Sequence, residues 1–332
     1  MEVKLLLTLL LFSIGISNSV NALGNNISVF TGISIVPDTI RNNAKPDIYS
    51  PSLITELPLK VKETSGLVFF DDMLWTLNDS GNPAEIYQID SATGKVIRTV
   101  AIVNSDNIDW ESMTQDSLNV YIGDFGNNSG TRTNLYILRI KKTDLKNPAS
   151  VSVRAGIIYF HYPDQKEFKP ASNKTNFDCE AFFFLNDSLH LFSKDWADQH
   201  SRHYVIPAKA GNYKARLIEE FNVDGLITDA SVNKQGNIVL LGYKNTGGKF
   251  WDCFCWVISG YTKSNFFGGQ KKRIELGSAM QVGQSEAIIL NDDNTAWLSS
   301  ESIKVSILFI PAKLFGLDLN PYFMQLNKQT LK

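Results

Sequence analysis

Five stretches of the chain repeat one order of residues: an acid, a strand-like run, a turn rich in Asp, Asn, Ser or Gly, and a second strand-like run. They are KETSGLVFFDDMLWTLNDSG, NIDWESMTQDSLNVYIGDFGNN, NFDCEAFFFLNDSLHLFSKDW, LITDASVNKQGNIVLLGYKN and GQSEAIILNDDNTAWLSSES. The aligned acids are Glu63, Glu111, Glu180, Asp229 and Glu286, at intervals of 48, 69, 49 and 57 residues. Short β runs at this spacing, separated by turn residues, predict an all-β array of repeated units.

Each unit continues with two further strand-like runs. The third runs are EIYQID, LYILRI, HYVIPA, FCWVIS and, at residues 307–312, ILFIPA. The fourth runs are KVIRTVAI, GIIYFHYP, RLIEEFNV and KRIELG, and the fifth unit has none of its own. Four antiparallel strands per unit make the blade of a β-propeller.

The missing strand has a candidate before the first repeat. SLITELPLKV, residues 52–61, reads as a fourth strand without a unit. Pairing it with the last blade would close the ring and remove the exposed sheet edges. We therefore predict five blades, with six as the alternative if the 69-residue unit or the C-terminal tail contains another. A β-sandwich or two small β domains would not explain the repeated acids.

The N-terminus predicts export. Lys4 precedes an apolar stretch, Leu5 to Ile16, and Val20 and Ala22 are small residues placed for cleavage. This is the pattern of a signal peptide over residues 1–22, although a buried helix is the alternative. Residues 23–51 would then be an extension and 52–332 a single propeller, in a secreted, periplasmic or extracellular protein. No later segment is long and apolar enough to span a membrane.

Charge and cysteine content narrow the function. Lys and Arg number 32 against 34 Asp and Glu, so no nucleic-acid binding is expected. Cys179, Cys253 and Cys255 are too few for a disulfide scaffold, and we expect packed thiols.

The repeated acids predict a metal site. The first strand of each blade lines the channel of a propeller, so equivalent residues form a ring. Carboxylates facing one narrow space need raised pKa values or a cation among them. Oxygen ligands favour Ca²⁺, with Mg²⁺ second. The predicted metal ligands are Glu63, Glu111, Glu180, Asp229 and Glu286; the alternative is that each acid merely caps a loop or pairs with a neighbour.

A second layer of polar residues should surround this ring. Hydroxyls of Ser65, Ser112, Thr228 and Ser285, and the outer acids Asp109 and Asp178, are placed to assist it. Second strands run back to the same face, so their ends and the following loops should contact a ligand. The predicted ligand-binding residues are Asn78, Asp79, Asp124, Asn127, Arg132, Lys194, Lys244 and Glu301. We expect His161 and His190 to be structural, and His200 and His203 to be loop residues near this face.

The motifs ETSGL, DWES, DCEA, QSEA and YIGDFGNN resemble uncharacterised secreted propellers of Bacteroidetes-type bacteria, over nearly the whole mature chain. A looser similarity is to calcium-activated nucleotidases (apyrases), five-bladed propellers that bind Ca²⁺ in the channel with glutamates and serines. That resemblance implies ligation by Glu63, Glu111, Glu180 and Ser285–Glu286. The fourth blade departs from it with Thr228–Asp229, and the basic residues that a nucleotide's phosphates require are not matched. Regucalcin-like lactonases and phytases also hold a metal in a propeller channel, but a shared fold does not establish a shared reaction.

Two functions follow from these patterns. The first is an exported Ca²⁺-binding propeller that recognises a small molecule, a glycan or a protein at the channel mouth. The second is a Ca²⁺-dependent hydrolase of a phosphoester, nucleotide or lactone, with Glu111, Glu180 or Asp124 as base. A sugar-cleaving propeller with paired carboxylates is a third possibility. Whether the protein is an enzyme stays open at this point.

Overall fold

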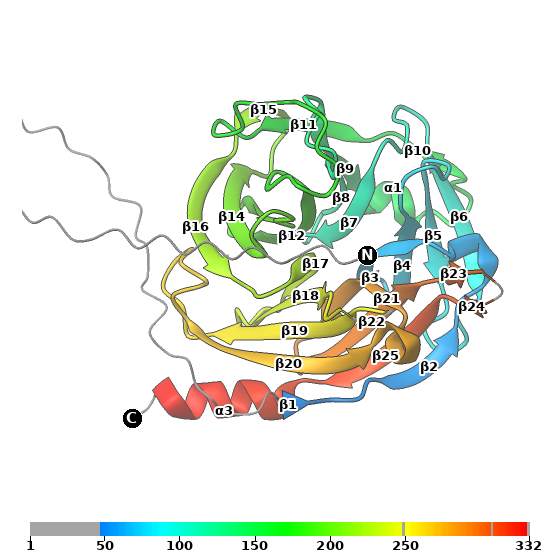
Figure 1. Ribbon diagram of the computed structural model, residues 1–332. Helices are drawn as coiled ribbons and strands as arrows, with labels where there is room; N and C mark the ends of the chain where they lie inside the picture. The colour runs from blue at the N-terminus through cyan, green and yellow to red at the C-terminus, as the bar shows by residue number, and fades with distance from the viewer. Residues whose placement is uncertain (1–46, 248–249, 307, 331–332) are drawn as a thin grey trace, which may run out of the picture. The chain divides into compact units, whose positions relative to one another are not determined.

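The structure is a computed structural model that describes residues 47–247, 250–306 and 308–330. The predicted signal peptide and most of the predicted extension lie outside these residues. Five sheets surround a central channel (Figure 1) and form a five-bladed β-propeller, as the repeats predict. The innermost strands of the five blades contact one another in a closed ring.

Each blade is a meander of four antiparallel strands that runs from the channel outward. The first blade contains β3 (Thr64–Phe70), β4 (Met73–Asn78), β5 (Glu85–Ile89) and β6 (Val96–Ile102). The second contains β7 (Trp110–Gln115), β8 (Asn119–Asp124), β9 (Leu135–Lys141) and β11 (Gly156–His161). The third contains β12 (Cys179–Leu185), β13 (Ser188–Ser193), β14 (His200–Pro207) and β16 (Arg216–Asn222). The fourth contains β17 (Leu226–Val232), β18 (Ile238–Lys244), β19 (Asp252–Ser259) and β20 (Gln270–Ser278).

The fifth blade is built from both ends of the domain. Its inner strands are β21 (Gln284–Leu290), β22 (Thr295–Glu301) and β25 (Lys313–Asp318). The N-terminal strand β2 (Ser52–Glu56) pairs antiparallel with β25 and completes the blade. The predicted closure of the ring is confirmed.

The predicted third strand of this blade is wrong. We placed it at residues 307–312, but β25 begins at Lys313. Within the earlier segment, β24 (Leu308–Ile310) pairs with β23 (Ile303–Val305) in a separate hairpin. Both segments have the apolar, β-branched or aromatic composition of a strand, so composition alone did not distinguish them.

Short elements extend the blades. Three added strands pair in parallel with outer strands: β1 (Asp47–Ile48) with β20, β10 (Ser152–Val153) with β6, and β15 (Gly211–Lys214) with β11. The helices are η1 (Leu59–Val61), α1 (Lys142–Lys146), α2 (Ala279–Val282) and α3 (Asn320–Thr330). Among the described residues, none of the helices has the length and apolarity that a membrane crossing needs.

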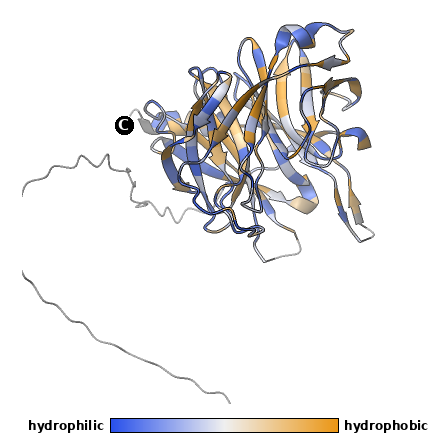
Figure 2. Cartoon of the chain, turned by 90° about the horizontal axis from the view of Figure 1, so that it is seen from above, coloured by the Kyte–Doolittle hydropathy of each residue, from blue (hydrophilic) through white to orange (hydrophobic). Residues whose placement is uncertain are grey.

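The blades are held together by apolar layers between them. Five main clusters of buried side chains each draw on two neighbouring blades, so that every interface in the ring is filled. The inward-facing strand residues supply these layers, and Figure 2 shows the hydrophobic colour concentrated in the strands, with hydrophilic residues in the connecting loops. All three cysteines are buried and free, as expected. Burial of these layers supplies the main stabilisation of the ring.

Tight turns between first and second strands match their sequences. Asp71 and Asp72 both have positive φ, at 56° and 58°, and so do Asn186 and Asp187, at 49° and 58°. Two consecutive left-handed residues are the signature of a type I′ hairpin turn, which Asp and Asn tolerate. The turn chemistry therefore fixes where the first strand ends in the first and third blades.

Candidate functional site

A β-bulge near the start of the first strand sets the geometry of the site in every blade. Each of these strands skips one residue in its pairing with the second strand. Because a bulge re-aims its side chain, the skipped residues are structurally equivalent positions of the five blades. They are Ser65, Glu111, Glu180, Thr228 and Glu286.

This register corrects the expectation that five acids occupy one position. Only Glu111, Glu180 and Glu286, which we call the bulge carboxylates, are acids at the bulge. Glu63 lies two residues before the bulge of its blade, at the position equivalent to Asp109 and Asp178. Asp229 lies one residue after the bulge of the fourth blade. The ring therefore combines three glutamates with the two hydroxyl residues Ser65 and Thr228.

The first strands begin, and the second strands end, at one edge of the ring, which we call the channel mouth. The pairs Thr64–Asn78 and Trp110–Asp124 show that strand ends return to this edge as expected. Asp79 directly follows β4, and Asp109 directly precedes β7. Each of Asp79, Asp109 and Glu111 places a carboxylate oxygen within 4.8 Å of the other two.

Gly126 packs against two of these three carboxylates. A Cβ atom on this residue would lie 2.0 Å from Glu111 Oε1 and 2.6 Å from Asp109 Oδ2. The φ angle of Gly126 is not in the left-handed region, so backbone conformation does not require glycine here. The glycine instead leaves room for Asp109 and Glu111 to point into the space beside the loop.

Arg132 holds the loop that contains Gly126. Its guanidinium donates to Gly126 O at 2.9 Å and to Asp124 Oδ1 at 2.7 Å. Tyr136 donates a further hydrogen bond to Asp124 Oδ2 at 2.8 Å. Asn127 donates its backbone N–H to Asp178 and accepts from the backbone N–H of Arg132 at 2.8 Å. Asp124, Asn127 and Arg132, which we predicted as ligand contacts, therefore bind one another and the loop backbone.

Lys194 lies among the acids of the mouth. Its ammonium is 3.1 Å from Glu180 Oε1, and each of the two side chains is only 7% exposed. The same ammonium lies 5.1 Å from the ring centre of Trp196 and 5.2 Å from that of Tyr243. The Lys194 ammonium is thus a positive charge that the protein itself places beside the bulge carboxylates.

Burial raises the pKa of the carboxyl groups at the mouth, and their mutual repulsion adds to the shift. Burial, then Asp79 and Glu180, raise the pKa of Glu111 well above its usual value. Burial raises the pKa of Asp79, Asp109 and Glu286 to about 6 in each case, against the effect of nearby hydrogen-bond donors or cations. Burial alone would lower the pKa of Lys194, but the carboxylates of Glu180 and Glu286 raise it, so the lysine stays charged.

The other predicted residues take distinct places. Asn78 accepts from the backbone N–H of Glu63 at 3.2 Å and donates to Lys60 O at 2.9 Å, which fixes the start of the first blade. Lys244 forms an ion pair with Asp224 at 2.5 Å. Glu301 lies at the mouth, where burial and then the repulsion of Glu286 raise its pKa.

Two mouth residues were missed from the sequence. Gln284 donates to Glu286 Oε1 at 2.7 Å and to Glu301 Oε2 at 3.1 Å. Tyr243 contributes its ring beneath Lys194. Gln284 stands two residues before its bulge, where Asp109 and Asp178 stand in their blades, so an alignment on the bulge would have found it. Tyr243 pairs with Leu226, two residues before its bulge, and the same alignment would have found it as well. Its equivalents in the other blades are Asp79, Phe125, Lys194 and Glu301.

Asp229 lies deeper in the channel and is 1% exposed. Its Oδ1 accepts from Ser112 Oγ at 2.6 Å, and its Oδ2 accepts from the backbone N–H of Ile288 at 2.7 Å. Ser112 belongs to the second blade and Asp229 to the fourth, so this hydrogen bond crosses the channel.

The expectation that His200 and His203 are loop residues was wrong. His200 and His203 both lie in β14, and His203 is fully buried between the third and fourth blades. His203 Nδ1 is 2.9 Å from Glu219 Oε1, and its Nε2 is 2.8 Å from His190 Nδ1. Glu219 also accepts from the backbone N–H groups of Phe266 and Phe267. This series of hydrogen bonds links the third and fourth blades at their interface and does not reach the mouth.

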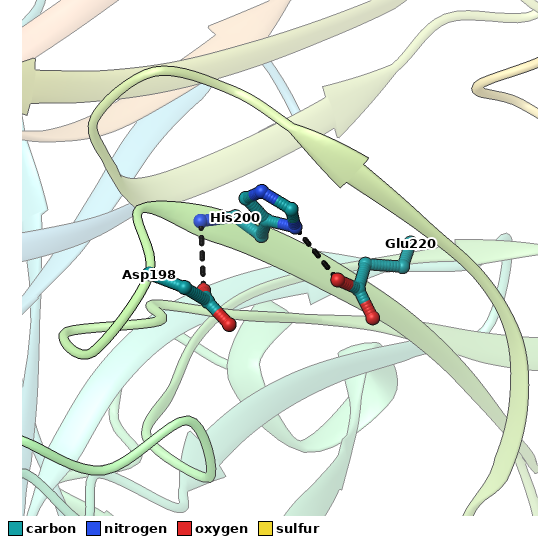
Figure 3. A group of neighbouring side chains, drawn as sticks. All are labelled: Asp198, His200 and Glu220. Carbon is teal, nitrogen blue, oxygen red and sulfur yellow. Dashed lines mark hydrogen bonds and ion pairs between the residues drawn. The ribbon is translucent and has the colours of Figure 1, made fainter. Parts of the chain in front are cut away.

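A second group with metal-binding residue types occurs on β14, β16 and the loop before β14. Figure 3 shows His200 between Asp198 and Glu220, with His200 Nδ1 2.6 Å from Glu220 Oε1. Arg202 already pairs with Asp198 and Glu220, each at 3.2 Å. Because a guanidinium neutralises both carboxylates, this group is an ion-pair network on the blade surface.

Many solved structures are similar in fold to this chain, whereas comparisons of its sequence found no match. No family model matches the sequence, and no curated protein matches it. Similar solved structures include an α-L-arabinanase of Penicillium chrysogenum, at 12% identity, TM-score 0.45, and coverage of 82% of this chain and 99% of that one. Others are a GH43 β-1,3-galactosidase (11% identity, TM-score 0.44, 81% and 94% covered) and a putative glucose dehydrogenase of Thermus thermophilus (9% identity, TM-score 0.41, 80% and 99% covered). At these scores the likeness says nothing about chemistry.

Proposed function

We propose that the protein is an exported propeller that binds Ca²⁺ at Asp79, Asp109 and Glu111 and uses the ion to hold a ligand at the channel mouth. The observation that carries the proposal is the convergence of three carboxylate oxygens within 4.8 Å of one another. Two of them point into space that only a glycine at position 126 leaves open. Arg132 Nη1 lies 4.0 Å from Asp109 Oδ2 and offsets part of this negative charge. The remaining charge favours bound protons or a multivalent cation.

The donor set fits a hard cation. It contains only carboxylate oxygens, which suit Ca²⁺ and Mg²⁺ and not the softer metals that prefer His and Cys. Ca²⁺ accepts irregular shells of six to eight oxygens, whereas Mg²⁺ demands an octahedron, so an open group of three acids favours Ca²⁺. The remaining coordination positions would be left to water and to oxygen atoms of a ligand.

The charges at the mouth favour a neutral, hydroxyl-rich ligand such as a glycan. A phosphate ligand needs cationic side chains that are free to bind it. Arg132, Lys194 and Lys244 are each paired with a carboxylate, at Asp124, Glu180 and Asp224. Hydroxyl groups of a sugar can complete the shell of Ca²⁺ without such residues, which supports recognition as the role of the site.

Hydrolysis is the second candidate, and one observation favours it. Glu111 and Glu180 are close enough to share a hydrogen bond, and burial raises the pKa of both. A protonated carboxyl beside an ionised one can serve as general acid and base. A screen of phosphoester, nucleotide, lactone and glycoside substrates, run with Ca²⁺ and with chelator, separates the two roles, since recognition alone gives no turnover.

Metal binding is tested by thermal unfolding and calorimetry. Ca²⁺ should raise the melting temperature of chelator-treated protein more than Mg²⁺ does, by linkage worth about 2.7 kcal/mol at a hundredfold excess over Kd. Asp109→Asn and Glu111→Gln should abolish most of that shift. Glu167→Gln is the matched control, because Glu167 is 73% exposed and pairs with Lys169. Equal Ca²⁺ responses in all three variants would show that these acids do not bind the ion.

A further inference from the structure

A pocket of about 360 Å³ lies at the edge of the ring opposite the channel mouth. Its lining includes Asp71, in the turn between β3 and β4, and Leu145, in the helix α1 that follows β9. First and third strands end at this edge, so the pocket lies between the first and second blades, at the far end of the strands from the acids of the mouth. Its volume is within the range of pockets that hold small organic ligands.

The strand register places three side chains of the first blade side by side in this pocket. Trp75 pairs with Gln88, and Gln88 pairs with Arg98, across β4, β5 and β6. Residues paired directly across a sheet project from the same face, and all three line the pocket. The Arg98 guanidinium lies 5.2 Å from the centre of the Trp75 ring, and this cation–π contact holds its head group in place.

Arg98 has few partners for a guanidinium. Its Nη2 donates to Leu145 O at 2.6 Å, and within residues 47–247, 250–306 and 308–330 it forms no ion pair. Its Nε is covered without an acceptor, whereas its Nη1 is neither covered nor hydrogen-bonded in the same part of the chain. Burial lowers the pKa of Arg98 from its usual value, because it removes water from a charge that no acid offsets. An anion beside Nη1 would supply the missing partner.

The other charged and polar groups of the lining favour a single negative charge on the ligand. Two cations, Arg98 and Lys146, and one acid, Asp71, line the pocket, so its net charge is +1. Lys146 Nζ already lies 3.0 Å from Asp71 Oδ1, which leaves Arg98 as the unpaired charge. The amide of Gln88, beside Arg98 in the sheet, is neither covered nor hydrogen-bonded among the described residues. Its N–H groups are therefore free to donate to the same anion.

The rim of the pocket is apolar. Ile97, next to Arg98 in β6, is 52% exposed, and Pro148, after α1, is exposed as well. A ligand with an apolar part would cover both side chains and remove them from water. The pocket therefore combines an unpaired guanidinium, a free amide and an apolar rim.

We propose that this pocket binds a small monocarboxylate, whose carboxylate accepts from Arg98 Nη1 and from the Gln88 amide while its apolar part contacts Ile97 and Pro148. Sulfate and phosphate fit less well, because two negative charges exceed the single positive charge of the lining. The proposal is independent of the function proposed for the mouth, which lies at the other end of the blades.

The test is calorimetric titration of the full chain, in the presence of chelator, with benzoate as the probe. Benzoate should bind at one site per chain and more tightly than acetate, which lacks the apolar ring, or sulfate, which carries two charges. Arg98→Gln should weaken benzoate binding by about tenfold or more, the effect of losing a hydrogen bond between charged groups. Arg154→Gln is the matched control, because Arg154 is exposed and does not line the pocket.

A second variant keeps the test decisive if Arg98→Gln does not fold, since Arg98 also binds the end of α1. Gln88→Ala leaves the contacts of Arg98 in place and should weaken benzoate binding by about three- to tenfold. The proposal is overturned if benzoate shows no saturable binding, or if Gln88→Ala binds it as tightly as Arg154→Gln does. Benzoate affinity no higher than that of acetate or sulfate would also overturn it.

Discussion

Replacing Gly126 with alanine tests the geometry of the acid group at its tightest point. The added methyl would lie 2.0 Å from Glu111 Oε1 and 2.6 Å from Asp109 Oδ2, well inside van der Waals contact. Both atoms are at the ends of side chains, so the two carboxylates can rotate away from the added methyl group. The backbone then need not move. We expect a loss of about 1 kcal/mol in unfolding free energy without Ca²⁺, the lower end of the cost of overpacking. Two of three ligands would be displaced, so we expect Ca²⁺ affinity to fall by about ten- to a hundredfold, or roughly 1.4 to 2.8 kcal/mol.

Gly156→Ala is the matched control for this substitution. Gly156 also lacks a positive φ, and a Cβ there would meet only Arg139 O, at an ordinary 3.8 Å. Urea unfolding in chelator gives the first quantity, and calorimetric titration with Ca²⁺ gives the second. The control should change neither by more than about 0.5 kcal/mol. If Gly126→Ala binds Ca²⁺ as tightly as the control does, Asp109 and Glu111 do not coordinate the ion together.

Two further predictions concern buried carboxyl groups. Burial raises the pKa of Asp79 and Asp109 to about 6, so the stability that their protonated forms contribute is present at low pH and is lost as pH rises through about 6. Chelator-treated protein should therefore have a higher melting temperature at about pH 5 than at about pH 7.5. Ca²⁺ should raise the melting temperature more at the higher pH. A Ca²⁺-induced change in melting temperature that is independent of pH contradicts this prediction. Glu219→Gln should cost about 1–3 kcal/mol in urea unfolding, because an amide group would face one of the donors that Glu219 now accepts from. Glu220→Gln is the control, because Glu220 is the exposed neighbour of Glu219. Equal effects of the two substitutions would show that the buried hydrogen bonds from Glu219 to His203 contribute little to the free energy of unfolding.

The propeller could be predicted because its determinants are local. Strand composition, the Asp- and Asn-rich turns and the repeat spacing all act within a few residues, and the orphan strand at residues 52–61 pointed to the ring closure. The blade-five error has the same origin, since residues 307–312 and β25 share the same local composition. Which of them joins the sheet depends on pairing with β22 and with β2, and β2 is distant in sequence.

The site could be predicted only in part, because its register depends on the backbone. A bulge shifts every later side chain by one residue and has no side-chain signature of its own. Aligning the five repeats on their acids therefore gave the correct register in the blades whose bulge residue is Glu111, Glu180 or Glu286. It gave a wrong register in the two blades whose bulge residue is Ser65 or Thr228. The charge of Lys194 was visible in the sequence, but its place among the bulge carboxylates required the fold.

The departures in the first and fourth blades change which groups line the channel. One layer below the bulge, Asp229 accepts from Ser112 across the channel and from Ile288 in the fifth blade. A fully buried carboxylate tied to non-adjacent blades narrows the channel there, and the hydroxyl of Thr228 ties to Ser285 O beside it. With Ser65 and Thr228 in place of acids, the negative charge concentrates on the second, third and fifth blades. Lys194 compensates Glu180 of the third blade at 3.1 Å, and Arg132 lies 4.0 Å from Asp109 beside the second, so these two cations of the protein offset part of the charge. An added cation at the mouth would offset more of it.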